Sequence, residues 1–192
     1  DFSAKAGVPN AFGVIGNDRN AIEPGKRMLS SMTPTILLDD GEPALVLGTP
    51  GGSTIFTSVF QVILNLYDFG MPLPQAVDAL RFHHQLPAAD LIRHDQREIP
   101  SSTRKGLEKL GYRVEPNSWG NLGDIQAIRV EAGQVRAAAD SRGRGAAHVF
   151  TVGPGDRCSH WTAGAGSPKI SGQCVHARDA QRVPCIPGTN QS

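Results

Sequence analysis

The sequence predicts an α+β fold in which strands and helices are grouped in separate blocks. Short apolar runs around turn residues come first, apolar residues at helical spacing follow, and further apolar runs come last. Such grouping favours a layered α+β domain over alternating strand and helix units around a parallel sheet. With 192 residues, 39% of them hydrophobic, the chain is long enough to bury one sizeable core.

The first elements are an irregular segment and a hairpin. Residues 1–24 are rich in Gly, Pro, Asn and Asp, which predicts a loop. The apolar runs 35–38 and 44–47 flank the turn sequence Asp-Asp-Gly-Glu at 39–42. This pattern is typical of two antiparallel strands joined by a tight turn.

A long helix is predicted next, from Ile55 to just before Gly70, with Ser53 as its N-cap and Gly70 as the residue that ends it. We expect it to be buried on a broad face. The apolar residues at helical spacing are Ile55, Phe56, Val59, Phe60, Ile63, Leu66 and Tyr67.

Two shorter helices and further strands complete this region. Residues 74–80 predict a second helix, and Ser101 or Ser102 is expected to cap a third helix that ends at Gly111. The apolar residues that follow predict a returning strand and a second hairpin. These strands are expected at 112–114, 125–130 and 135–139, with a turn at Ala132-Gly133.

The composition changes after residue 150. Residues 151–192 contain all three cysteines together with Gly and Pro, and they show no apolar periodicity. We therefore expect one domain over residues 1–150 and a disordered or foreign tail over 151–192. The alternative for the tail is a zinc site, but its Cys-x-His pairs lack the usual ligand spacing, so we expect no metal. The residues concerned are Cys158, His160, Cys174, His176 and Cys185.

Charge and hydropathy argue against nucleic-acid binding and against a membrane-spanning segment. The formal net charge is +1, and no run of Lys and Arg with interleaved aromatic residues is present, so no nucleic-acid partner is expected. The most apolar stretch, 55–66, is too short to span a bilayer and contains Gln61 and Asn65. No cofactor is expected either.

Gly51 and Gly52 stand where a strand gives way to the long helix. Glycine lets backbone N–H groups approach a reacting carbonyl, and a helix N-terminus favours negative charge, so the pair suits an oxyanion hole. The alternative is that these glycines only permit a tight turn. A phosphate-binding loop is rejected because that motif needs a Lys directly before its Ser or Thr, and here Gly52 precedes Ser53.

Three further residues are candidates for binding a small charged substrate. The adjacent hydroxyls of Ser30 and Ser31 could donate to a carboxylate, and Asp1 could accept from an ammonium group. The alternatives are a local serine turn for the pair and a solvated side chain for Asp1.

Two other polar groups are expected to be structural. His83 and His84 lie on an extended segment and should point to opposite sides, which favours packing and hydrogen bonding over metal binding. Arg142 and Arg144 with Asp140 are expected to form a solvated charged turn rather than an ion-pair cluster.

Four separated motifs resemble the small subunit of the γ-glutamyltranspeptidases, over roughly residues 1–150. They are DFSAKAGVPN at 1–10, KRMLSSMTPT at 26–35, LGTPGGSTI at 47–55 and ALRFHHQ at 79–85. The resemblance implies an N-terminal-nucleophile hydrolase with an αββα sandwich, of which this chain is an incomplete part. It also implies a large-subunit partner from the same precursor, a γ-glutamyl substrate, no cofactor, and a periplasmic or extracellular location that the chain itself does not reveal.

The resemblance assigns roles to the candidate residues. Asp1 would bind the α-amino group of the glutamyl donor, Ser30 and Ser31 its α-carboxylate, and the N–H groups of Gly51 and Gly52 the oxyanion. Phe12 falls where many members carry a tyrosine on a loop over the pocket, so a latch through that hydroxyl is not expected here.

The resemblance also places the nucleophile upstream of Asp1, as a threonine at the N-terminus of the small subunit that self-cleavage frees. Its own α-amino group activates it, so no internal threonine can replace it. We therefore expect this 192-residue chain to be inactive by itself. The alternatives are a non-catalytic glutamyl-binding module, or a fragment of a related acylase or poly-γ-glutamate-cleaving enzyme.

Overall fold

A computed structural model describes residues 1–85, 90–151, 172–177 and 186–187 of the chain. The chain divides into two compact units, each built from separate stretches of sequence. The first unit comprises Asp1–Thr33, Thr49–Val62 and Leu80–Gly123, and the second comprises Pro34–Gly48, Ile63–Ala79 and Asp124–Ser192.

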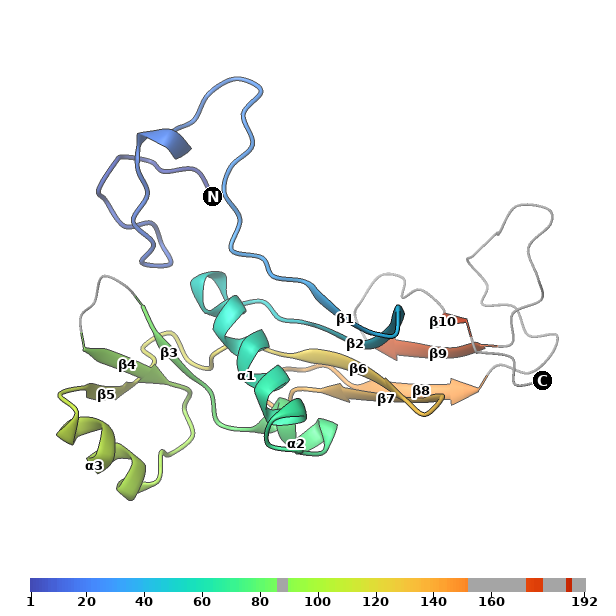
Figure 1. The fold of residues 1–192 in the computed structure, drawn as a ribbon. Coiled ribbons are helices and arrows are strands. Elements are labelled where there is room, and N and C mark those ends of the chain that lie inside the picture. The colour runs from blue at the N-terminus through green and yellow to red at the C-terminus, as the bar shows by residue number, and fades with distance from the viewer. Residues whose placement is uncertain (86–89, 152–171, 178–185, 188–192) are drawn as a thin grey trace. The chain divides into compact units, whose positions relative to one another are not determined.

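The second unit contains an antiparallel sheet of four strands in the order β1-β2-β6-β7 (Figure 1). Its strands are β1 (Thr35–Asp39), β2 (Glu42–Gly48), β6 (Gln126–Glu131) and β7 (Gln134–Ala139). Both predicted hairpins are confirmed. Their two-residue turns have positive φ at both positions, 48° and 88° at Asp40-Gly41 and 47° and 72° at Ala132-Gly133, as type I′ turns require.

Helix α1 (Ile55–Tyr67) matches its predicted bounds, and Gly70 with φ 60° follows its end as expected. The expected cap is wrong, because Ser53 lies in a 3-10 turn, η2 (Gly52–Thr54), and its hydroxyl donates to the Phe12 carbonyl at 3.2 Å. A 3-10 turn satisfies the first backbone groups itself, since the Thr54 N–H donates to the Gly51 carbonyl.

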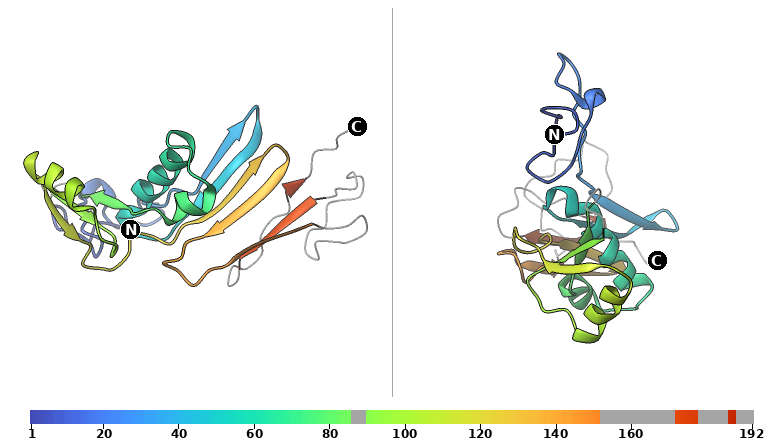
Figure 2. Two further views of the ribbon diagram at one scale, coloured as in Figure 1. Left: turned by 90° about the horizontal axis from the view of Figure 1, so that it is seen from below. Right: turned by 90° about the vertical axis from the view of Figure 1, so that its left-hand side faces the viewer.

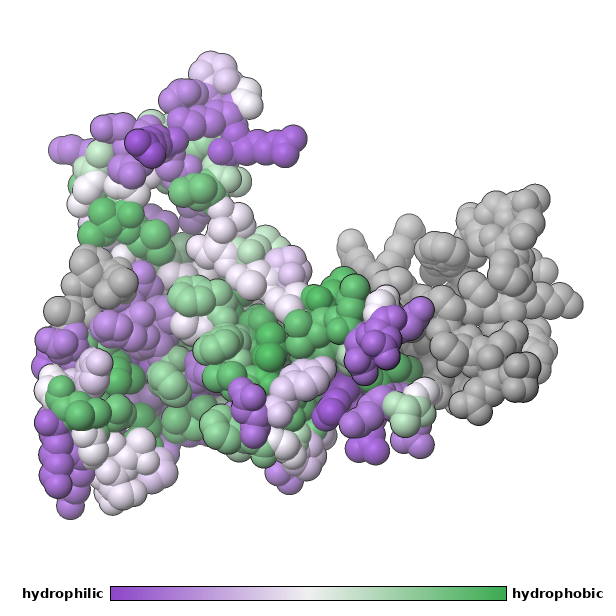
Figure 3. Space-filling model, in the orientation of Figure 1, coloured by the Kyte–Doolittle hydropathy of each residue, from purple (hydrophilic) through white to green (hydrophobic). Residues whose placement is uncertain are grey.

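The buried face of α1 is narrower than expected. Residues at positions i, i+4, i+7 and i+11, namely Ile55, Val59, Val62 and Leu66, are buried. The neighbouring stripe is not: Phe56, Phe60 and Tyr67 are 54%, 57% and 49% exposed. Figure 3 shows hydrophobic residues at the surface over this helix. The short helix α2 (Leu73–Asp78) forms as predicted and buries Leu73, Ala76 and Val77.

The first unit contains a sheet of three strands, β3 (Phe82–His84), β4 (Leu91–His94) and β5 (Arg113–Pro116), in that order (Figure 1). Figure 2 shows this green part of the chain from two further sides. Strands β3 and β4 are antiparallel, and β4 and β5 are parallel, with α3 (Ser101–Lys109) in the connection between them. This strand, helix, strand unit corrects the predicted separation into blocks, because β4 was not expected. Pro100, not a serine, occupies the N-cap position of α3.

One face of this small sheet builds a core with α3. Ile92, Ile99 and Val114 are buried there, and partly buried hydrophobic residues pack against them. These are Leu80, Leu107 and Tyr112. The other face of the sheet is therefore left for the cavity described below.

Strands β8 (Ala147–Thr151), β9 (Gly172–Ala177) and β10 (Ile186–Pro187) form another sheet in the second unit. Apart from these strands, the tail predicted over 151–192 lies outside the described residues, as do Cys158, His160 and Cys185 of the zinc alternative. No helix in the described part of the chain is both long and apolar enough to cross a membrane.

Candidate functional site

Phe12 lies at the tip of a tight loop in the first unit. Pro9 and Ile15 pair across the base of the loop as an isolated bridge. The Asn10 side-chain oxygen accepts from the N–H groups of Phe12 and Val14, at 2.9 and 3.0 Å. Phe12 is 44% exposed, and its ring centroid lies 6.4 Å from that of Trp119. The loop thus holds an aromatic side chain out from the backbone.

This loop lines a cavity of about 860 Å³ that lies wholly within the first unit. The volume is within the range of about 300–1,000 Å³ that is common for small-molecule sites. The structure brings Phe12, Gly51 and Gly52 together in the lining of this cavity. The other lining residues are Pro9, Gly13, Ile15, Pro50, Ser53, Thr54, His83, Gln85, Leu91, Arg93, Asn117, Ser118, Trp119 and Asn121.

Both glycines of the pair are required by their backbone and their surroundings. Gly51 has φ 145° and Gly52 has φ 58°, where other L-residues are strained. A Cβ on Gly52 would lie 2.3 Å from Phe12 Cδ1, and one on Gly51 would lie 2.7 Å from Thr54 Oγ1. The tight turn is therefore real, and it also keeps the Phe12 ring against the backbone of Gly52.

The same turn leaves backbone donors unused. In the described part of the chain, the N–H groups of Gly51 and Gly52 have no hydrogen-bond acceptor. They precede α1, whose N-terminus adds favourable potential for negative charge. The geometry can therefore bind an anionic oxygen at the cavity wall.

Asp1 and Ser30 are held near each other by a residue that the sequence analysis did not single out. The buried side chain of Asn20 donates from Nδ2 to the Asp1 carbonyl at 2.8 Å and accepts at Oδ1 from the Leu29 N–H at 3.1 Å. The main-chain nitrogen of Asp1 also donates to the Leu29 carbonyl at 2.5 Å. Two stretches that lie 28 residues apart in sequence are thus joined directly before Ser30.

The serine pair itself is exposed. The Ser30 hydroxyl oxygen accepts from the Met32 N–H at 3.1 Å, which is the local serine turn that was kept as an alternative. Its hydrogen remains available, because this contact uses only the oxygen. Among the described residues, the Ser31 hydroxyl has no partner. Asp1, Ser30 and Ser31 do not line the cavity of Phe12 and the glycines.

His83 and His84 point to opposite sides of β3, as predicted. His83 is 4% exposed, and its ring nitrogens lie 2.9 Å from Thr57 Oγ1 and 2.8 Å from Gln85 Oε1. His84 is exposed. Neither histidine belongs to a group of metal-ligating side chains in the described ranges. His83 thus serves as a hydrogen-bonded wall of the cavity.

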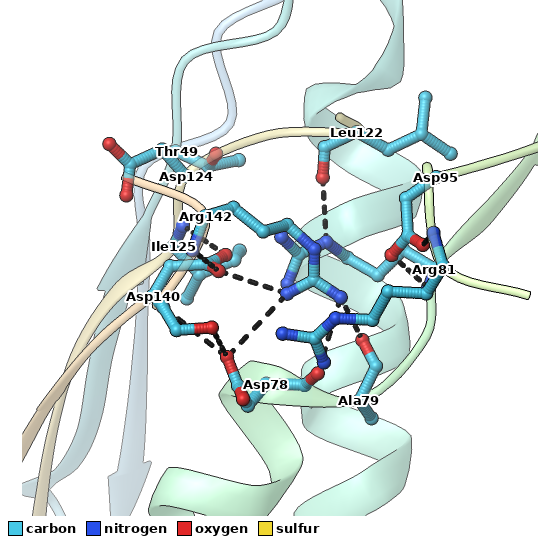
Figure 4. A network of polar contacts seen from close by, with 12 residues as sticks. Thr49, Asp78, Ala79, Arg81, Asp95, Leu122, Asp124, Ile125, Asp140 and Arg142 are labelled. Atoms are coloured by element: carbon cyan, nitrogen blue, oxygen red, sulfur yellow. Dashed lines mark hydrogen bonds and ion pairs between the residues drawn. The ribbon is translucent and has the colours of Figure 1, made fainter. Parts of the chain in front are cut away.

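The solvated turn expected at Asp140 and Arg142 is wrong. In the second unit the Arg142 side chain is 3% exposed and its Nη1 lies 2.9 Å from Asp140 Oδ1 (Figure 4). Nη2 donates to the Ala79 carbonyl at 2.7 Å, and the other Asp140 oxygen accepts from the Ile125 N–H. Burial of the pair is possible because each partner satisfies the other and nearby backbone groups. Arg144 is exposed, as the prediction required.

Sequence reasoning also missed Arg81 and Trp119 in the first unit. Arg81 is 1% exposed, and its Nε donates to the Leu122 carbonyl at 2.6 Å. Trp119 is 69% exposed and faces Phe12. Arg81 belongs to the ALRFHHQ motif, but no role was assigned to it there, and Trp119 stands in no recognisable pattern, so only the fold reveals these contacts.

Comparison with known proteins gives a consistent result. A family model described as Gamma-glutamyltranspeptidase matches residues 1–150. The glutathione hydrolase proenzyme of Pseudomonas aeruginosa is 57% identical over 146 residues, which are 76% of this chain and 26% of that protein. The glutathione hydrolase proenzyme of Escherichia coli is 46% identical over 144 residues, or 74% of this chain and 24% of that protein. The chain thus spans about a quarter of the length of these curated relatives.

Solved structures agree. The γ-glutamyltranspeptidase from Pseudomonas nitroreducens, complexed with L-DON, superposes with a TM-score of 0.71 and 56% identity. The match covers 74% of this chain and 74% of that chain.

Proposed function

The chain belongs to the γ-glutamyltranspeptidase family, and from this we propose that residues 1–150 are part of the small subunit of a γ-glutamyl-transferring enzyme. The complete enzyme would transfer the γ-glutamyl group of glutathione or a related donor to water, amino acids or peptides. The relatives named above are glutathione hydrolase proenzymes, which supports this substrate class.

One observation carries the proposal: Asn20 ties the Asp1 backbone to the residue before Ser30. An amino acid offers an ammonium group and a carboxylate on the same carbon, so its binding site needs an acceptor and donors close together. Asp1 supplies a carboxylate, and Ser30 and Ser31 supply hydroxyl donors. The Asn20 contacts bring these chemically opposite groups into one neighbourhood.

The glycine pair would act at the other end of the donor, where the γ-carbonyl group reacts. We propose that an upstream threonine hydroxyl attacks the γ-carbonyl carbon of the donor and passes its proton to its own α-amino group. The carbonyl oxygen becomes an oxyanion, which the free N–H groups of Gly51 and Gly52 stabilise. One donor of this kind is typically worth about 3 kcal/mol in the transition state.

Two steps then complete the reaction: collapse of this tetrahedral intermediate to an acyl-enzyme, and transfer of the acyl group. The C–N bond to the leaving group cleaves, and the leaving amine takes the proton, which leaves a γ-glutamyl ester on the threonine. Water or an acceptor amine then attacks the ester carbonyl and gives a proton to the threonine α-amino group. The ester C–O bond breaks, the threonine oxygen takes up that proton, and glutamate or the γ-glutamyl product is released. Phe12, at the cavity wall beside Gly52, would limit access of water to the ester.

The assembly is part of the same proposal. We infer that the described strands belong to an incomplete αββα sandwich, which upstream strands and a large subunit of the same precursor complete. A periplasmic or extracellular location is proposed from the family alone. Support for a precursor comes from the relatives, which are named proenzymes and are about four times as long as the matched region.

The serine pair provides the test. In the complete enzyme, the change Ser30→Ala with Ser31→Ala should lower kcat/KM for a γ-glutamyl anilide by at least about 100-fold, because two hydrogen bonds to a charged group contribute about 1.5–3 kcal/mol each. Most of this loss should appear in KM. The rate is measured by release of the chromophoric aniline.

The adjacent serines at the start of α3 give a matched control. The change Ser101→Ala with Ser102→Ala removes the same hydroxyl pair from an exposed site in the same unit and should leave KM unchanged. An unchanged KM in the Ser30 and Ser31 variant would contradict the proposed role. Glutamate binding without turnover by the complete protein would instead indicate a non-catalytic binding module.

A further inference from the structure

We propose that the cavity contains a second carboxylate-binding site, with Arg93 as its cation. It would recognise the free carboxylate of the leaving group or of the acceptor, beyond the bond that is cleaved or formed. This inference rests on the proposed function and adds to it, since the glutamyl α-carboxylate is assigned to Ser30 and Ser31, which do not line the cavity.

Strand register directs Arg93 into the cavity. His83 on β3 pairs with Arg93 on β4, and residues that lie directly opposite each other share one face of a sheet. His83, Leu91 and Arg93 all line the cavity. Their neighbours face the other way, because Ile92 lies in the core and His94 Nε2 lies 3.3 Å from Arg104 Nη2 of α3.

The charge of Arg93 is only weakly neutralised. Its Nη1 lies 3.8 Å from Glu115 Oε2, beyond hydrogen-bond distance, and the Arg93 side chain is 34% exposed. Glu115 is also 3.4 Å from Arg113 Nη1, so one carboxylate is shared by two arginines. Among the described residues that line the cavity, Arg93 is the only Lys, Arg, Asp or Glu. The cavity therefore carries excess positive charge at this wall.

Neutral donors lie on the neighbouring loop. Asn117, Ser118 and Asn121 line the cavity, and the loop is fixed to β4 because the Asn117 N–H donates to the His94 carbonyl at 2.7 Å. Amide and hydroxyl donors beside a guanidinium are the groups that commonly bind a carboxylate. The cavity of about 860 Å³ has room for more than the reacting amide.

These features select a chemical class of ligand. The oxyanion donors of Gly51 and Gly52 and the Arg93 guanidinium belong to the same cavity, so a molecule that reacts at the glycines can extend to Arg93. Glutathione ends in a glycine carboxylate on the leaving-group side, and amino-acid and dipeptide acceptors carry a carboxylate as well. A γ-glutamyl anilide has none on that side.

The experiment compares substrates with and without this carboxylate in the complete enzyme. Hydrolysis of glutathione, glutathione glycine ethyl ester and a γ-glutamyl anilide is followed with wild type, Arg93→Gln and Arg93→Lys. We expect Arg93→Gln to lower kcat/KM for glutathione about tenfold, the lower range for a hydrogen bond to a charged group. The ester and the anilide should change less than about twofold, as for a surface substitution, and Arg93→Lys should retain part of the preference for glutathione.

Arg113→Gln is the matched control, because Arg113 shares Glu115 but does not line the cavity. Arg113→Gln should leave kcat/KM unchanged for all three substrates. Transfer to glycylglycine and to glycylglycinamide by Arg93→Gln then shows which molecule supplies the bound carboxylate. A raised KM for glycylglycine alone assigns the site to the acceptor, and a loss of kcat/KM confined to glutathione hydrolysis assigns it to the leaving group.

Equal losses for glutathione and its ester, or no loss for any carboxylate-bearing substrate, would overturn the inference while the proposed function stands. Failure of the proposed function is distinguishable, because wild type would then turn over none of the three donors.

Discussion

Asn20 has a larger role at the scale of single residues than its type suggests. Its side chain contacts the Asp1 carbonyl, the Leu29 N–H and the Ser3 hydroxyl, and its own carbonyl accepts from the Ser3 N–H. A buried amide that is satisfied in this way fixes the loops around it, since losing one partner leaves the others unpaired. Asn20 is therefore a positioning residue for the groups proposed to hold the glutamyl head.

Substitution of Asn20 separates its two contacts. Asn20→Asp keeps an acceptor for the Leu29 N–H but removes the donor to the Asp1 carbonyl, whereas Asn20→Ala removes both. We expect KM for a γ-glutamyl anilide to rise about tenfold in Asn20→Asp and further in Asn20→Ala, from about 1–3 kcal/mol for each unsatisfied buried group. Steady-state kinetics of the complete enzyme measures this, with kcat much less affected.

Asn17→Ala serves as the control for Asn20. Asn17 caps the same 3-10 turn, η1 (Asp18–Asn20), through the Arg19 N–H but contacts neither Asp1 nor Leu29. Its loss should lower the free energy of unfolding by about 1 kcal/mol, the typical contribution of a capping side chain, and leave KM unchanged. Equal KM values for the Asn17 and Asn20 variants would show that Asn20 contributes to stability alone.

The sequence indicated the chemistry of Asp1, Ser30 and Ser31 but not what joins them. Asn20 lies in a segment without periodicity, and a lone asparagine in such a segment resembles any turn residue. Arg142 was misjudged for a related reason. A charged residue next to a glycine predicts an exposed turn, and its burial depends on acceptors at Ala79 and Asp140 that no local pattern brings together.

The junction of β2 and α1 is the critical feature at the scale of elements. Gly52 and Gly70 flank the helix with nearly equal φ values of 58° and 60°. Only Gly52 has a close neighbour, since nothing lies within 4 Å of a Cβ built on Gly70. Comparing substitutions at Gly52 and Gly70 therefore separates the effect of backbone strain from the effect of contact with the Phe12 loop.

Alanine at the two positions gives different results. Gly70→Ala should cost about 1–2 kcal/mol of folding free energy, the strain of an L-residue in the left-handed region. Gly52→Ala should cost the same and also displace Phe12, so KM for the donor rises only in this variant. Urea unfolding and donor kinetics measure the two effects. If adding Phe12→Ala to Gly52→Ala does not lower the raised KM, the clash with Phe12 is not the cause of the rise.

Elements with strong local signals were predicted well. Asp40-Gly41 and Ala132-Gly133 fix two hairpins through the positive φ that their turns require, and Gly70 ends α1 for the same reason. Strand β4 was missed because LIRH is short and half polar, so its pairing with β3 and β5 decides its conformation. The buried face of α1 was overestimated because helical spacing alone does not say which of two adjacent stripes faces a partner.

At the scale of the whole molecule, the comparisons establish the family, whereas the described geometry supports the proposed roles of single residues. The match over residues 1–150 and the likeness to a solved γ-glutamyltranspeptidase establish the family. The activity of a complete enzyme remains the proposal, because the chain spans about a quarter of its curated relatives. What the described units add is a wall of free backbone donors and an Asn20-linked pair of loops, each within the first unit.

A crystal structure of the complete protein with bound glutamate tests these assignments most directly. The α-carboxylate should lie at about 2.7–3.1 Å from the hydroxyls of Ser30 and Ser31, with the ammonium group at the Asp1 carboxylate. The γ-carboxylate should place one oxygen within the same distance of the N–H groups of Gly51 and Gly52. Glutamate bound away from these residues, or with its two ends exchanged, would contradict the proposed site.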